Sequence, residues 1–214
     1  MARTRKPSGL PDKGKARGRR PNDALPESLR FLIVCEGKRT EKHYFERFKA
    51  NVKVHSIRVE GVGVDALGVV GAALAIARQD SLAGREGYDQ VWCVFDRDSL
   101  SAERFNAALA EAQCQGFYVA YSNQAFELWY WLHFDYQHTG ISRADYGAKL
   151  TERLGFPYRK NDLRMYDRLL SYQFTAIRNA QRLLDAYGPD HNPERDNPCT
   201  TVHLLVQELN RHVR

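Results

Sequence analysis

FLIVCEG (residues 31–37) and VWCVFDRD (residues 91–98) decide the fold of this chain. Each stretch begins as an almost purely apolar run and ends abruptly in carboxylates. Such a run is typical of a strand covered on both faces, as in the parallel sheet of an α/β protein. In open sheets of this kind, ligands bind in the crevice beyond the carboxyl ends of the strands. We therefore expect Glu36, Asp96 and Asp98 to meet at one edge of a parallel sheet.

Apolar runs alternate with helical patterns around these two stretches. We expect strands over 30–35, 52–60, 90–95 and 117–121, and helices over 39–50, 65–82 and from Ser99 or Ser101 to about 114. This order implies right-handed crossovers and a parallel sheet flanked by helices, a Rossmannoid α/β arrangement. The remainder predicts helices over 126–134, 142–154, 162–186 with a break near 171–174, and from Cys199 onward, with a loop over 188–198.

The charge pattern and these elements divide the chain into three parts: a basic tail (1–28), an α/β domain (29–136) and a helical C-terminal extension (137–214). Residues 1–20 hold eight Lys or Arg and one Asp, so the tail accounts for the formal net charge of +6. Its Gly, Pro, Lys and Arg content predicts disorder. It either contacts nucleic acid phosphates or merely solubilises the chain.

The remaining bulk features predict a cytoplasmic protein without a membrane partner. The four cysteines show no CxxC spacing, so we expect them to be reduced and mostly to pack in the interior. No apolar run approaches the roughly 20 residues that span a bilayer. The basic N-terminus has no apolar segment behind it and is not a secretory signal.

The three acids at the strand ends suit a metal ion. Asp96 and Asp98 are two positions apart, which puts both side chains on one side of an extended segment. Two carboxylates so close disfavour joint ionisation unless a cation neutralises them. With Glu36, they offer the hard oxygen ligands that Mg²⁺ or Mn²⁺ prefers. The alternative is that Asp96 caps the following helix and Asp98 is a solvated loop acid.

An apolar strand ending in Glu-Gly, followed later by a strand ending in Asp-x-Asp, resembles the Toprim domains of topoisomerases, primases and OLD-type nucleases. More narrowly, four stretches in order resemble the RloB family, a bacterial Toprim-like family associated with anti-phage defence. They are LIVCEGKRTEKHYF (32–45), VWCVFDRD (91–98), SNQAFELWYWLHF (122–134) and NPCTTVHLLVQEL (197–209).

The resemblance implies a Toprim-like α/β domain and a metal-dependent phosphodiester nuclease, often encoded beside an SMC/ABC-type ATPase partner. By analogy with related effectors, it makes tRNA a plausible target. It matches Glu36 to the Toprim glutamate, and Asp96 and Asp98 to the Asp-x-Asp motif. Toprim proteins often carry a further acid and a glycine soon after that motif. Residues 96–100 have neither, which argues against a second fully coordinated metal.

Two further acids are candidates for the same crevice. Glu41 either supplies another metal ligand or favours the N-terminus of the first helix. The Glu-Gly-x-x-Thr-Glu pattern of the resemblance favours the metal. Glu127 stands among apolar residues and needs a partner, either an Arg or the metal, and we expect a catalytic role for it.

Several polar and basic residues are candidates for binding nucleic acid. Lys38, Arg39 and Lys42 lie beside Glu36, where they either clamp a phosphate or form a solvated helix face. Asn123 opens onto the crevice from the fourth strand. Lys160 and Arg164 in the helical part are weaker candidates of the same kind. Two histidines are given no role here: we expect His133 in the core and His203 on the surface of the last helix.

The function most consistent with these residues is metal-dependent hydrolysis of a phosphodiester bond in nucleic acid. The resemblance implies that the protein is an effector of an ATPase-coupled anti-phage system. The alternative is a non-catalytic partner of an ATPase that binds a nucleotide or nucleic acid. A primase-type phosphotransferase ranks below both, because no nucleotide-triphosphate site or zinc element is recognisable. The sequence does not choose between DNA and RNA.

Overall fold

The computed structural model describes residues 29–52 and 56–213. The tail predicted over 1–28 therefore lies outside the described residues, as do residues 53–55 of the predicted second strand. Among the described residues, no helix is both long enough and apolar enough to cross a membrane.

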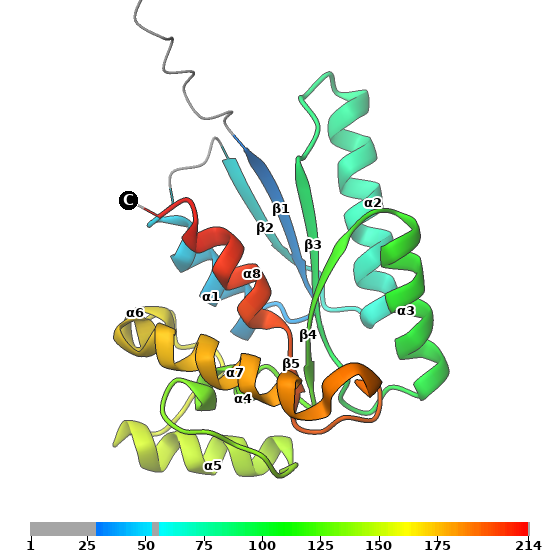
Figure 1. Cartoon of the computed structure of the whole chain (residues 1–214). Coiled ribbons are helices and arrows are strands. Elements are labelled where there is room, and N and C mark those ends of the chain that lie inside the picture. The colour runs from blue at the N-terminus through cyan, green and yellow to red at the C-terminus, as the bar shows by residue number, and fades with distance from the viewer. Residues whose placement is uncertain (1–28, 53–55, 214) are drawn as a thin grey trace, which may run out of the picture.

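A five-stranded sheet with the strand order β2-β1-β3-β4-β5 forms the centre of the fold (Figure 1). Its strands are β1 (Arg30–Cys35), β2 (Ser56–Gly61), β3 (Gln90–Asp96), β4 (Tyr118–Asn123) and β5 (Cys199–Thr200). The first four are parallel, and only β5 runs antiparallel, beside β4. The predicted α/β class with a largely parallel sheet is confirmed.

Helices cover both faces of the sheet. They are α1 (Thr40–Lys49), α2 (Ala66–Leu82), α3 (Ala102–Cys114), α4 (Glu127–Leu132), α5 (Arg143–Leu154), α6 (Met165–Leu169), α7 (Gln173–Tyr187) and α8 (Val202–Asn210), with short 3₁₀ turns at Leu170–Tyr172 and Gly188–Asp190. In Figure 1, α2 and α3 lie on one side of the sheet, and α1 and α8 lie on the other.

The alternation of side chains in β1 builds two separate cores. Phe31, Ile33 and Cys35 pack into one buried cluster with side chains of α1, α4, α5, α7 and α8. Leu32 and Val34 pack into a second cluster with side chains of α2 and α3. All five are fully buried, as expected for a strand that is covered on both faces. The cluster around Phe31 joins residues from both sides of position 136, and the predicted domain boundary there stays a prediction.

Three local expectations need correction. Residues 199–200 form the short strand β5 instead of starting a helix, because they pair with Ser122 and Asn123 at the end of β4. That pairing also extends β4 to Asn123, two residues beyond the predicted end. His203 is fully buried instead of lying on the surface, and its Nε2 lies 3.3 Å from Oε1 of Gln181 on α7.

Other expectations are confirmed. His133 is buried, and its Nδ1 lies 2.8 Å from the carbonyl oxygen of Trp129. The four cysteines are free, and all but Cys114 are buried. Ser142 begins α5 with a capping box, in which its hydroxyl and the Asp145 carboxylate each accept a backbone hydrogen bond of the other residue.

Candidate metal and phosphate site

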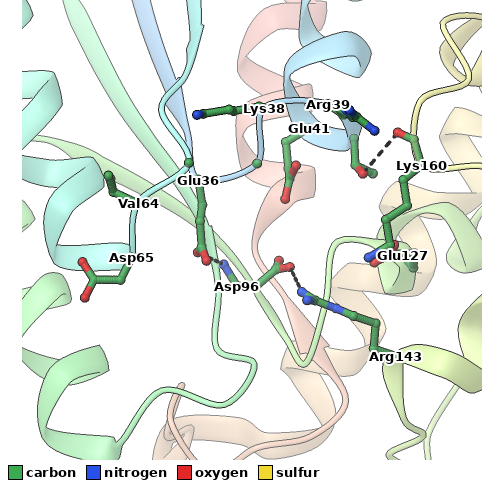
Figure 2. Close-up of a pocket in the computed structure, with 13 residues that line it drawn as sticks. Glu36, Lys38, Arg39, Glu41, Val64, Asp65, Asp96, Glu127, Arg143 and Lys160 are labelled. Atoms are coloured by element: carbon green, nitrogen blue, oxygen red, sulfur yellow. Dashed lines mark hydrogen bonds and ion pairs between the residues drawn. The ribbon is translucent and has the colours of Figure 1, made fainter.

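The acids at the ends of β1 and β3 lie side by side. The backbone N–H of Asp96, the last residue of β3, donates a 3.1 Å hydrogen bond to Oε2 of Glu36. Glu36 follows β1 directly, and β1 and β3 are parallel neighbours, so their carboxyl ends meet at the same edge. Figure 2 shows both side chains at one cavity. The structure therefore brings together two acids that are 60 positions apart in the chain.

A cavity of about 620 Å³ opens at this edge of the sheet. Its lining carries five carboxylates, four of which were predicted, together with four cationic side chains. The lining residues are Glu36, Gly37, Lys38, Arg39, Thr40, Glu41, Gly63, Val64, Asp65, Asp96, Glu127, Arg143 and Lys160. The cavity thus gathers residues from the ends of β1 and β3, the first turn of α1, and the helical part of the chain (Figure 2).

Glu41 reaches this cavity because Gly37 has no side chain. A Cβ atom at residue 37 would overlap the Glu41 carboxylate. Glu41 lies in the first turn of α1 and is only 6% exposed. The glycine of the Glu-Gly pair therefore makes room for an acid four residues further along.

Arg143, which the sequence did not single out, holds both aspartates. Its Nη2 lies 2.6 Å from Oδ2 of Asp96, and its Nη1 lies 3.0 Å from Oδ2 of Asp98. Arg143 is the first residue of α5, so the capping box at Ser142 fixes its position. Asp98 is not among the residues that line the cavity. It lies in the turn after β3, where its backbone N–H donates a 3.1 Å hydrogen bond to the carbonyl oxygen of Gln124.

Glu127 finds its partners in the segment between α5 and α6. Its carboxylate is buried. Oε1 accepts a hydrogen bond from the hydroxyl of Tyr158 at 3.2 Å and forms an ion pair with Nζ of Lys160 at 3.3 Å. The expected partner of this buried acid was an Arg or the metal. In the structure, a lysine and a tyrosine that follow α5 in the chain satisfy it.

Burial in the cavity raises the pKa of three acids, Glu36, Glu41 and Asp96. Burial is the largest cause in each case: it raises the pKa of Glu36, raises that of Glu41 to about 7, and raises that of Asp96 well above its usual range. Repulsion from the neighbouring carboxylates adds to the effect at Glu41 and Asp96. The negative charge of the cluster is therefore only partly compensated by Arg143 and Lys160.

A hard divalent cation suits this donor set, because the cavity offers several carboxylate oxygens and excess negative charge. Within residues 29–52 and 56–213, however, no three His, Cys, Asp or Glu side chains are already arranged to hold a metal. Arg143 instead forms ion pairs with both aspartates. The oxygen atoms of these residues suit the cation, but in this structure a guanidinium is paired with two of the carboxylates.

The other predicted site residues divide into two groups. Lys38, Arg39 and Lys160 line the cavity. Lys42 lies outside it, with its Nζ 4.0 Å from Oε2 of Glu60. Asn123 is also outside the lining, and its amide donates to the carbonyl oxygens of Glu194 at 3.4 Å and Asp196 at 3.0 Å.

Comparison with known families identifies the chain. It matches the model of the RloB-like protein family over residues 31–209, which is most of the described structure. No curated protein matches the chain, and no solved structure matches it. The matched range begins in β1 and ends in α8, so it covers both strand ends that carry the acids and every helix of the cavity. The chain therefore belongs to the family of RloB-like proteins.

Proposed function

We propose that this protein is a metal-dependent phosphodiesterase of the Toprim type that cleaves nucleic acid. The observation that carries the proposal is the convergence of Glu36 and Asp96 from adjacent parallel strands onto one cavity with basic residues at its margin. Glu36, Asp96 and Asp98 would hold Mg²⁺ or Mn²⁺, with Glu41 as a further ligand. A cation bound there would polarise the scissile phosphate and lower the pKa of an attacking water.

The chain's own residues then have separate tasks. Lys38 and Arg39 at the cavity margin bind and orient phosphate oxygens, which places the reacting group before any bond is broken. Arg143 balances the charge of the two aspartates and fixes their orientation. Glu127, held by Tyr158 and Lys160, is the carboxylate that we assign to accept a proton at Oε1 or Oε2 beside the phosphate.

Membership of the RloB-like family supports a narrower proposal: an effector of an ATPase-coupled anti-phage system, with an SMC/ABC-type ATPase as partner and tRNA as one candidate substrate. A second function, a non-catalytic partner of an ATPase that binds a nucleotide or nucleic acid, draws on a different observation. Arg143 forms ion pairs with both Asp96 and Asp98, so part of the negative charge of the cluster is compensated without a metal ion.

Cleavage assays on end-labelled tRNA, single-stranded RNA, single-stranded DNA and duplex DNA test the proposal, each with Mg²⁺, with Mn²⁺ and with EDTA. We expect metal-dependent cleavage by the wild type, and its loss in Glu36→Gln and Asp96→Asn. The control is Glu152→Gln, which removes one exposed acid from α5 outside the cavity. Full activity of Glu36→Gln would refute the proposal. Binding without turnover on every substrate, even with the ATPase added, would favour the second function.

A further inference from the structure

A second cavity, of about 600 Å³, lies beside the first along the segment that joins α5 to α6. Arginines dominate the charge of its lining, since it holds three of them and one acid. The lining residues are Phe156, Pro157, Arg159, Asn161, Asp162, Leu163, Arg164 and Arg168. None of these arginines contributes to the carboxylate cluster, so the cavity has no task in the site described above.

Consecutive residues of one segment line the two cavities. Arg159 lines the second cavity, and Lys160, the next residue, lines the first and contacts Glu127. Adjacent Cα atoms are about 3.8 Å apart, so neighbouring positions of one short segment contribute to both cavities. The carbonyl oxygen of Lys160 accepts a 3.3 Å hydrogen bond from Oγ1 of Thr40, which attaches this segment to the first turn of α1 (Figure 2).

Two of the arginines are available to a ligand. Arg159 and Arg164 are exposed, and neither forms an ion pair within the described part of the chain. Arg168 is held instead: its Nε lies 3.3 Å from Oδ2 of Asp162, and its guanidinium lies over the Phe156 ring at 4.4 Å from the centroid. The cavity therefore offers two cations without an ion-pair partner among the described residues, beside an arginine that is held over an aromatic ring.

This combination matches the chemistry of an unpaired nucleotide. Guanidinium groups bind phosphate oxygens with two parallel hydrogen bonds, and a base stacks on an aromatic ring or on the plane of an arginine. Leu163, which is 63% exposed at the same cavity, adds an apolar contact for a base. A paired base within a duplex keeps its faces stacked on its neighbours and does not present them to such a plane.

We propose that the second cavity binds the nucleotide next to the scissile phosphate, and that the substrate strand is unpaired at this point. Arg159 and Arg164 bind its phosphates, and the Arg168–Phe156 stack contacts its base. This inference rests on the proposed function, because it assumes that the first cavity holds the scissile phosphate. According to this inference, residues outside the carboxylate cluster select the class of substrate, which is single-stranded or looped nucleic acid.

Binding measured without metal separates this inference from the proposed function. Fluorescence anisotropy in EDTA, where no cleavage is expected, would use labelled 12-nucleotide single-stranded RNA, single-stranded DNA and a 12-base-pair duplex. The test variant is Arg159→Gln/Arg164→Gln. The matched control, Arg178→Gln/Arg195→Gln, removes the same charge from exposed positions on α7 and the loop before β5. The basic N-terminal segment is present in every protein, so its contribution cancels.

We expect the test variant to bind a single strand at least about tenfold more weakly than wild type, with the salt slope reduced by about 1.4 for two lost phosphate contacts. The control variant should bind like wild type. Whichever single strand binds more tightly identifies the preferred sugar and supports the inference. Wild-type affinity of the test variant, an equal loss in the control, or a preference for the duplex would overturn it. Cleavage by Glu36→Gln would refute the proposed function while leaving this binding result standing.

Discussion

The backbone of Asp96 donates a hydrogen bond to the side chain of Glu36, across two strands whose ends carry the acids of the cavity. This contact fixes the Glu36 carboxylate beside the Asp96 carboxylate, which burial and neighbouring acids already hold at a raised pKa. Carboxylates crowd in this way at a cost in stability unless a cation or a proton neutralises them. Stability, pH and metal binding should therefore be coupled at this site.

The raised pKa of Glu41 should make the metal-free protein less stable as the pH rises. Its pKa is about 7 in the folded state, against a usual value of 4.5. Between those two values the folded chain binds more protons than the unfolded chain, so the free energy of unfolding falls as the pH increases through 7. Glu41 alone should contribute a loss on the order of 2–3 kcal/mol. Urea denaturation in EDTA at pH 5 and pH 8 measures it.

The variant Glu41→Gln isolates this contribution, because glutamine mimics the protonated acid at every pH. We expect it to be more stable than wild type at pH 8 in EDTA and to lose less stability between pH 5 and pH 8. Asp145→Asn provides the contrast. The hydrogen bonds that Asp145 accepts from Ser142 lower its pKa, so its removal should not relieve any loss at high pH. Equal stabilities of Glu41→Gln and wild type at pH 8 would contradict the prediction.

Replacing Arg143 should destabilise the metal-free protein and increase the stabilisation that Mg²⁺ provides. Arg143→Gln leaves Asp96 and Asp98 without their guanidinium partner, and Arg143 is 37% exposed, so we expect a destabilisation of about 1–3 kcal/mol at pH 8 in EDTA. Mg²⁺ should then raise the melting temperature of the variant more than that of wild type. Calorimetry with and without Mg²⁺ measures both effects.

Arg153→Gln is the control for that experiment, because Arg153 lies on the same helix but stacks over Phe134, away from the acids. Its response to Mg²⁺ should equal that of wild type. An Mg²⁺ response of Arg143→Gln no larger than that of Arg153→Gln would count against the role given to Arg143.

Glycine at position 37 should be needed for full stability, because the Glu41 carboxylate occupies the space of a side chain there. In Gly37→Ala, the added methyl group would overlap the Glu41 carboxylate, and we expect a loss of about 1–3 kcal/mol from overpacking. Removing the acid as well, in Gly37→Ala/Glu41→Ala, should relieve much of this loss, so the two substitutions should be strongly non-additive. Chemical denaturation of the four proteins in the cycle measures the coupling, and additive effects would exclude the contact.

Leu150 on α5 should be as important to stability as residues of the sheet. It is fully buried in the same cluster as Ile33 and Phe126. Leu150→Ala should therefore cost about 2–5 kcal/mol and shift one cooperative transition. Tryptophan fluorescence and far-ultraviolet circular dichroism should report the same midpoint. Two separate transitions would show that the helical part after residue 136 unfolds independently.

The strands that carry the acids could be predicted because their signal is local. The runs before Glu36 and Asp96 are long enough and apolar enough to indicate strands covered on both faces, and parallel strands bring their carboxyl ends to one edge. The strand β5 could not be predicted, because two residues show no periodicity and their pairing with Ser122 and Asn123 is a tertiary contact. The burial of His203 has the same origin, in packing against α7.

The cationic residues of the cavity are less predictable from the sequence than its acids. The capping box at Ser142 indicates where α5 begins, but nothing local shows that Arg143 meets Asp96, 47 positions earlier. The contact between Lys160 and Glu127 likewise depends on how the segment after α5 crosses the sheet edge. Sequence patterns thus predict the acids, whereas the cations that face them are determined by tertiary packing.

The anomalous signal of Mn²⁺ in crystals of the protein tests the central claim most directly, because it locates the ion independently of any substrate. We predict one strong peak in the cavity, with oxygens of Glu36 and Asp96 at about 2.0–2.3 Å, in the range of hard divalent cations. The peak should be absent from crystals of Asp96→Asn. A peak held by other residues, or none in this cavity at a saturating Mn²⁺ concentration that supports cleavage, would contradict the account.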